Sequence, residues 1–194
     1  MPDELDLSPA AREVARVAGN VADDQLGAPT PCTEYSVSDL LNHLIGLSVA
    51  FRDAAHKTGG STTPEAALAA GLDPQWRTTL PRRLDELVEA WKAPDAWTGM
   101  TAAGGVDLPG EVAGLVALDE IVLHGWDLAR ATGQEYHCDP VTTQVILEFT
   151  QQSATPEESD SREGIFGPVV AVADDAPLFD RALGYAGRDP HWRP

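Results

Sequence analysis

Apolar and polar positions along this chain recur with the period of amphipathic helices. In the segment 8–26, valines recur at spacings of three and four after a Ser-Pro start that suits a first helical turn. The segment 36–58 repeats the pattern. It begins with Ser36 and Asp39 in the spacing of a capping box and stops at a Gly-Gly pair. The pattern therefore predicts a helix over each segment.

Three later segments have the same helical period: 73–95, 108–133 and 139–153. Pro81 interrupts the first of them, and we expect a kink or a break there because proline has no backbone N–H. Gly133 closes the second, in the position typical of a helix C-terminus.

The segments between these helices have the composition of turns and loops. Residues 59–72 are expected to form a loop or a short, broken helical turn, and the glycine-rich segment 96–111 leaves room for a short hairpin at most. Residues 154–164 are acidic, which predicts a solvated loop outside the core. We expect one short helix in the tail that follows.

Four main amphipathic helices among these five segments, joined by modest loops, predict an all-α fold. We expect an up-and-down four-helix bundle with additional short C-terminal helices. The length of 194 residues favours a single domain over 1–194, with the bundle core at about 8–153 and a C-terminal extension at 154–194. The sequence contains no internal repeat and no glycine-rich nucleotide-binding motif.

Charge and composition exclude several classes of partner. The formal net charge of −18 argues against binding to nucleic acid or to an anionic membrane surface, which both require basic patches. No apolar run approaches the ~20 residues of a membrane-spanning helix, and the acidic start is unlike an export signal. We therefore expect a cytoplasmic protein with reduced cysteines, in which Cys32 is a small packing residue.

Two helices of the expected bundle each turn an imidazole towards the core. His43 shares the apolar face of Leu40 and Leu47, while Glu120 and His124 lie four residues apart on one face of their helix. A buried charge without a partner is costly, so these residues need a compensating group. Two histidines and one carboxylate form the ligand set of an open divalent-metal site.

The same residues also admit other interpretations. A histidine on an apolar face is often a hydrogen-bonded core residue, and polar pairs four residues apart occur on many helices. A metal site and a polar core network therefore both remain open at this point. Asp127, three residues after His124, fits an acceptor that orients the His124 ring, a general base, or an ordinary pair with Arg130.

Two motifs carry a resemblance to a known family. TPCTEYSVSDLLNHLIG (30–46) and LDEIVLHGWDLARATG (118–133) resemble the metal-binding domain of mycothiol-dependent maleylpyruvate isomerase, within the DinB-like superfamily. The ending FGPVVAVADDAPLFDRALGYAGRDPHW is similar to an actinobacterial subgroup of small, stand-alone proteins of this kind. The resemblance covers roughly residues 8–192 and implies a DinB-like bundle.

The resemblance also implies a site. In the family, the matching positions bind a divalent metal, so that His43, Glu120 and His124 are the expected ligands. The implied metal is usually zinc, and Ni²⁺ or other divalent ions suit the same donors. Two departures bear on function. The isomerase has a second, C-terminal domain that helps to hold its thiol cofactor, and we expect no counterpart here. Related thiol transferases often present three histidines, where this chain has a glutamate.

These expectations lead to three hypotheses about function. In the first, the metal activates a low-molecular-weight thiol of the mycothiol type, and the protein is a thiol transferase or isomerase acting on a small electrophile; bound water in place of the thiol would make it a hydrolase. The second is a non-catalytic metal- or ligand-binding module, and the third has no metal. The expected partner is a small-molecule substrate, and a homodimer formed through the outer helix faces is compatible with the sequence.

Metal binding is expected to weaken below about pH 6, where imidazoles become protonated.

Overall fold

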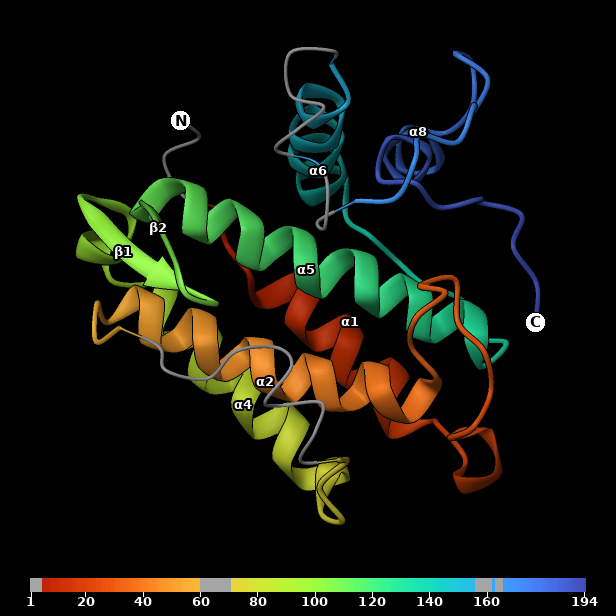
Figure 1. Ribbon diagram of the computed structural model, residues 1–194, viewed down its shortest axis with the longest axis horizontal. Coiled ribbons are helices and arrows are strands. Elements are labelled where there is room, and N and C mark those ends of the chain that lie inside the picture. Colours follow the sequence, from red (N-terminus) through yellow and green to blue (C-terminus); the bar gives the residue numbers. More distant parts are fainter. Residues whose placement is uncertain (1–4, 60–70, 156–161, 163–165) are drawn as a thin grey trace. The chain divides into compact units, whose positions relative to one another are not determined.

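The computed structural model describes residues 5–59, 71–155, 162 and 166–194 (Figure 1). By their internal contacts, the residues form two compact units, Met1–Tyr136 and His137–Pro194. The segments expected as a loop at 59–72 and as an acidic loop at 154–164 lie for the most part outside the described residues. The single domain expected over 1–194 stays a prediction.

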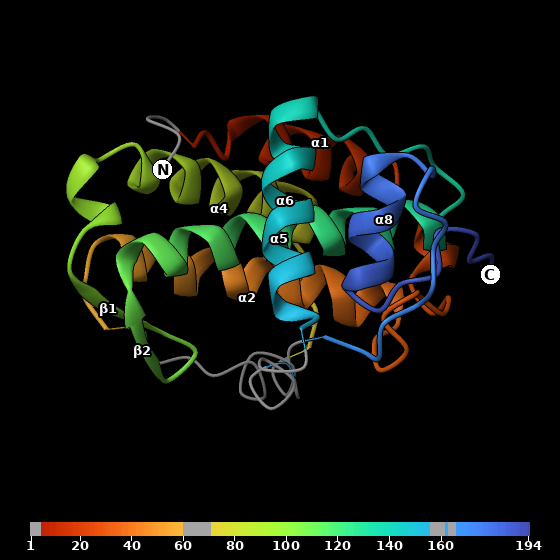
Figure 2. The same cartoon turned by 90° about the horizontal axis from the view of Figure 1, so that it is seen from above.

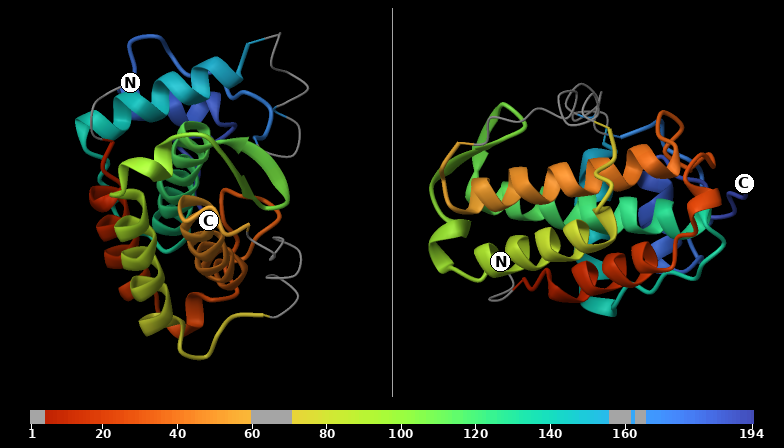
Figure 3. Two further views of the ribbon diagram at one scale, coloured as in Figure 1. Left: turned by 90° about the vertical axis from the view of Figure 1, so that its left-hand side faces the viewer. Right: turned by 90° about the horizontal axis from the view of Figure 1, so that it is seen from below.

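Four long helices form the first unit, as the hydrophobic pattern predicts. Both α1 and α2 pack on α4 and on α5, so the four helices form a ring in which α1 and α2 lie on opposite sides. Figure 3 shows the four helices running side by side. The expected, mostly helical bundle is thereby confirmed. Their bounds are α1 Ser8–Gly19, α2 Val37–Ala55, α4 Trp76–Trp91 and α5 Gly110–Ala131.

Leucines supply much of the core between these helices. Leu40 and Leu44 of α2, Leu84 of α4 and Leu118 of α5 are at most 1% exposed. The apolar face of each helix is thus buried against its two neighbours, which is the main source of stability for helices of this length.

Helix α2 begins where the capping box predicts. The Ser36 hydroxyl accepts the N–H of Asp39 at 3.3 Å, and the Asp39 carboxylate accepts the N–H of Ser36 at 3.1 Å. This reciprocal pair satisfies two backbone donors that a helix N-terminus leaves without partners. The cap fixes the start of the helix that carries His43.

Two of the expected helices differ from the structure. The helix expected over 8–26 ends at Gly19, and only a short 3₁₀ helix, η1 (Asp23–Gln25), follows it. Glycine has a low helix propensity, and the Gly-Asn pair at this point outweighs the apolar period beyond it. Helix α4 continues through Pro81, so the expected alternative of a break is wrong, while a kink stays a prediction. The carbonyl that loses its hydrogen-bond donor belongs to Arg77, an exposed residue.

The expected short hairpin is present between α4 and α5. Strands β1 (Met100–Ala103) and β2 (Val106–Pro109) pair antiparallel, after a 3₁₀ helix, η2 (Pro94–Trp97). Gly104 and Gly105 both have positive φ angles, as a tight two-residue hairpin turn requires. The hairpin leads directly into α5 (Figure 2).

The start of α5 packs unusually closely on two tryptophans. The Trp97 and Trp91 rings lie 4.8 Å apart between centroids. A side chain on Gly114 would place its Cβ only 2.3 Å from the Trp97 ring. Only glycine therefore allows α5 to approach these rings as it does.

The second unit is smaller and holds α6 (Pro140–Ser153) and α8 (Leu178–Tyr185), which pack on each other. Asp139 caps α6 by accepting two backbone N–H groups. The Arg162 guanidinium donates to the carbonyl oxygens of Gly167 and Tyr185. These bonds tie the chain after α6 to the end of α8. Among the described residues, no helix is long and apolar enough to cross a membrane.

Candidate metal centre

The structure brings together the three side chains that the sequence singles out. His43 projects from α2, and Glu120 and His124 project one turn apart from α5, which packs on α2. The Glu120 carboxylate oxygen Oε2 lies 3.3 Å from His43 Nε2 and 3.2 Å from His124 Nε2. One donor atom from each residue lies within 4.8 Å of the other two. We call these three residues the triad.

The triad is mostly shielded from solvent but not sealed. The side-chain exposures are 13% for His43, 10% for His124 and 24% for Glu120. The two imidazole rings meet edge to face, with centroids 4.8 Å apart. A cation or a small ligand could therefore reach the carboxylate from solvent while both rings stay held by the helices.

Asp127 holds the other side of the His124 ring. Its Oδ2 lies 3.0 Å from His124 Nδ1, and its side chain is fully buried. A carboxylate on Nδ1 fixes the ring orientation and leaves Nε2 directed towards Glu120. Of the roles considered for Asp127, the acceptor that orients His124 is the one that this contact supports.

The short distances within the site shift the pKa values of Glu120 and His124. Burial alone raises the pKa of Glu120, but hydrogen bonds with His124 and His43 outweigh it and hold that pKa well below its usual range. Burial alone lowers the pKa of His124, but hydrogen bonds with Asp127 and Glu120 raise it to about 9. In the metal-free protein, the triad therefore holds an ionised carboxylate beside a protonated His124.

The loop between α1 and α2 lies against the triad. The Thr30 hydroxyl lies 2.8 Å from the carbonyl oxygens of both Cys32 and Tyr35, which holds the loop in a tight turn before α2. The Tyr35 ring centroid is 5.2 Å from that of His43 and 6.2 Å from that of His124. Sequence reasoning missed Tyr35. The available signal was its place in a short connector directly before the helix that carries His43.

Cys32, expected to be a small packing residue, also lies near the site. Its sulfur is within 4.8 Å of a His124 nitrogen and an Asp127 oxygen. The residue is partly exposed. The cysteine therefore has ionisable neighbours that no pattern in the sequence identified.

Three arginines of α2 and α4 gather around one carboxylate of the protein. Arg52, Arg82 and Arg83 each place a guanidinium nitrogen within 2.9 Å of the Glu86 carboxylate. Arg52 also pairs with Asp53. Their charges are therefore largely compensated within the bundle.

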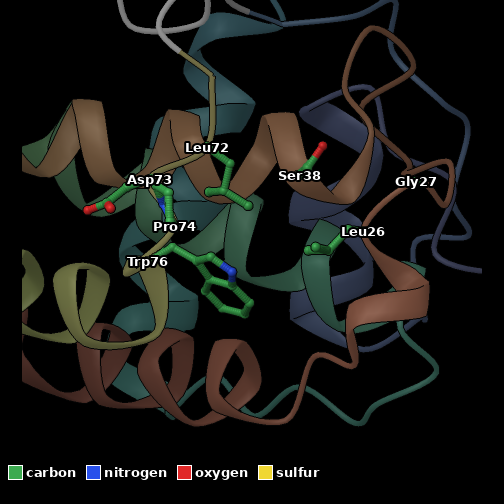
Figure 4. Close-up of a pocket in the computed structure, with 7 residues that line it drawn as sticks. All are labelled: Leu26, Gly27, Ser38, Leu72, Asp73, Pro74 and Trp76. Carbon is green, nitrogen blue, oxygen red and sulfur yellow. The ribbon is translucent and has the colours of Figure 1, made fainter.

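A shallow hollow of about 410 Å³ lies elsewhere on the first unit (Figure 4). The Asp73 carboxylate at its edge already accepts hydrogen bonds from the Thr79 hydroxyl and the Gln75 N–H. The Ser38 hydroxyl lies 3.0 Å from that of Ser36. No triad residue lines this hollow. Its lining consists of Leu26, Gly27, Ser38, Leu72, Asp73, Pro74 and Trp76.

A DinB-like helical bundle with two histidines and a glutamate meeting between two helices defines the class of this protein. The chain belongs to the family of the mycothiol maleylpyruvate isomerase N-terminal domain, whose pattern matches residues 7–129. It is 35% identical over 191 residues to the uncharacterized proteins MT0763 and Rv0738 of two Mycobacterium tuberculosis strains, CDC 1551 / Oshkosh and ATCC 25618 / H37Rv. Each alignment covers 90% of this chain and 91% of the relative.

Two crystal structures share the fold. The structure of the mycothiol-dependent maleylpyruvate isomerase matches with a TM-score of 0.70 at 20% identity, over 95% of this chain and 88% of that chain. A histidine-to-alanine mutant of the isomerase matches with a TM-score of 0.62 at 20% identity, over 78% of this chain and 69% of that one. The wider match extends well beyond residue 136. Because the match covers 88% of the isomerase chain, the expectation that its C-terminal domain has no counterpart here is wrong.

Proposed function

We propose that the chain binds a divalent cation at His43, Glu120 and His124 and uses it to activate a low-molecular-weight thiol of the mycothiol type. The thiol would then take part in S-transfer to a small electrophile or in its thiol-assisted isomerisation. The observation that carries the proposal is the carboxylate held within 3.3 Å of two imidazole nitrogens from different helices. Membership of a family named for a mycothiol-dependent isomerase supports the choice of a thiol.

The donors present fit a borderline-soft cation such as Zn²⁺. Two imidazole nitrogens and one carboxylate oxygen are typical of catalytic zinc sites, which keep a further position for water or substrate. The partial exposure of Glu120 agrees with an open position. When bound, a dication lowers the pKa of a coordinated thiol, so that a thiolate nucleophile forms at neutral pH.

The protein side chains have separate tasks in this proposal. Asp127 accepts a hydrogen bond from His124 Nδ1 and so holds the proton on that nitrogen. His124 therefore loses its other proton from Nε2, whose lone pair then binds the cation. Glu120 supplies the negative charge that offsets part of the cation. Tyr35 lies against both imidazole rings and limits the space beside them.

The proposal places the protein in the cytoplasm, where small thiols stay reduced. It also assigns zinc as the metal and a transferase or isomerase as the class of enzyme. Homodimer formation remains a prediction. The proposed site does not depend on it, because one chain supplies all three residues of the triad.

The test follows both the thiol and the electrophile, with untagged protein that has been stripped by a chelator and reloaded with Zn²⁺. Using a mycothiol-type thiol and small electrophiles, we expect thiol-dependent conversion of the electrophile by the loaded protein and a return to background with His43→Ala. S-transfer would consume the thiol in this conversion, whereas isomerisation would regenerate it. His56→Ala, at an exposed position after α2, should behave as the native chain. Equal rates for native chain and His43→Ala would overturn the proposal. Metal-dependent turnover that needs no thiol would indicate a hydrolase instead.

A further inference from the structure

A second group of donor atoms lies beside the triad. Among the described residues, Cys32, His124 and Asp127 also bring one donor atom each within 4.8 Å of one another. Asp127 is fully buried and His124 is nearly so, whereas Cys32 is partly exposed and gives access from solvent. Thiolate, imidazole and carboxylate together form a donor set for a d¹⁰ cation.

The carboxylates of the two groups face opposite nitrogens of one ring. His124 Nε2 faces Glu120 at 3.2 Å, and His124 Nδ1 faces Asp127 at 3.0 Å. A neutral imidazole has one lone pair available, because its other nitrogen carries a proton. His124 can therefore serve the triad or the group with Cys32, but not both at once as a neutral ligand.

We propose that Cys32, Asp127 and His124 form a second cation site, selective for thiophilic cations, that competes with the triad for His124. Binding there releases the Cys32 thiol proton to solvent and forms a sulfur–metal bond. Binding also displaces the proton on His124 Nδ1. That proton is released to solvent where Nε2 already carries a proton, and it moves to Nε2 where zinc has left that nitrogen. In both cases Nε2 then donates a hydrogen bond to Glu120. Soft ions prefer the sulfur donor, while the triad contains no sulfur.

The expected consequence is inhibition. With its proton on Nε2, His124 presents a donor to Glu120 and no longer a ligand to the triad. A thiophilic ion bound at Cys32 would thus empty the triad without binding to His43 or Glu120. Only this competition rests on the proposed function, because the sulfur site can form whether or not a cation binds at the triad.

Cadmium provides the direct test, because a cadmium–thiolate bond absorbs in the near ultraviolet and a cadmium–imidazole bond does not. The untagged, metal-free full chain is titrated with Cd²⁺ alone while this absorption is recorded. We expect it to saturate at one cation in the native chain and to be lost in Cys32→Ser. Cys138→Ser is the matched control, since Cys138 is also partly exposed but lies in the other unit. It should retain the signal.

Two further variants separate this inference from the proposed function. His43→Ala should keep the cadmium–sulfur absorption and lose Zn²⁺ binding, whereas His124→Ala should weaken both. In the native chain loaded with Zn²⁺, added Cd²⁺ should release zinc, and in Cys32→Ser it should release less. Absence of the absorption, or its equal loss in Cys138→Ser, would overturn the sulfur site. A sulfur site that forms without any zinc release would leave the site standing and reject the competition.

Discussion

At the scale of single residues, His124 is the most constrained side chain of the candidate centre. Each of its ring nitrogens faces a carboxylate, Glu120 at one and Asp127 at the other. The ring can therefore neither rotate freely nor be replaced without leaving a buried carboxylate with too few partners. The effects of substitutions follow from this arrangement.

Replacing His43 or His124 by alanine should remove most of the bound metal. Each variant loses one of three protein ligands and leaves Glu120 with a single imidazole partner. Metal content per chain and the thermal midpoint should therefore fall together. Both are measured on untagged protein with and without chelator.

The control for this pair is His56→Ala at an exposed position. It should change stability by no more than about 0.5 kcal/mol, as surface substitutions usually do. Metal content that stays unchanged in both triad variants would show that the triad is a polar core network.

Metal affinity should rise with pH up to about 9. The pKa of His124 is raised to about 9 in the metal-free protein, so a proton must leave before Nε2 can bind a cation. Below that value, we expect about a tenfold gain in affinity per pH unit. An unperturbed imidazole would place this change near pH 6, and the contacts with Asp127 and Glu120 move it upward.

The stability of the metal-free protein should change with pH in the opposite direction. Because the folded-state pKa of His124 lies above its unfolded value, the stabilising contribution is complete below about pH 6.5 and is lost as the pH rises through about 9. Thermal midpoints and metal titrations across this interval measure both effects. Affinity that does not vary between pH 7 and 9 would contradict the assignment of the proton to His124.

The elements of the fold followed from sequence more readily than their arrangement. Gly and Pro positions and the Ser36 cap predicted where most helices begin and end, because these signals act within a few residues. The meeting of His43 with Glu120 and His124 followed from helical period and family resemblance. The contacts of Cys32 and Tyr35 could not be predicted, because they depend on how the connector between α1 and α2 folds against helices distant in sequence.

At the scale of elements, Gly114→Ala should loosen the start of α5. The added Cβ would lie 2.3 Å from the Trp97 ring and 2.9 Å from the Trp91 ring. Overpacking of this kind costs about 1–3 kcal/mol. In a chain of this size, we expect the thermal midpoint to fall by roughly 2–4 °C per kcal/mol.

Gly19→Ala is the matched control for this substitution. Gly19 also lies in a helix, but nothing is within 4 Å of its added Cβ, so alanine should be neutral or stabilising. Equal stability of the Gly114→Ala and Gly19→Ala variants would mean that the tryptophan rings can move aside without loss of stability.

At the scale of the whole molecule, charge limits the partners of the chain. With a formal net charge of −18, the protein repels phosphate backbones, and we expect no specific binding to DNA or RNA. A mobility-shift assay at physiological salt should show free nucleic acid throughout. A tight complex under these conditions would reveal a local basic surface that the overall charge hides.

His43 and Glu120 lie 77 positions apart in the sequence. This separation affects local unfolding of the first unit. A cation bonded to both would join α2 to α5, so that neither helix could separate from the other without breaking a metal bond. Local opening of the two helices would then become one event, governed by release of the ion. In hydrogen exchange, amides of α2 and α5 should slow together on loading with metal, while those of α4, which supplies no ligand, should respond less.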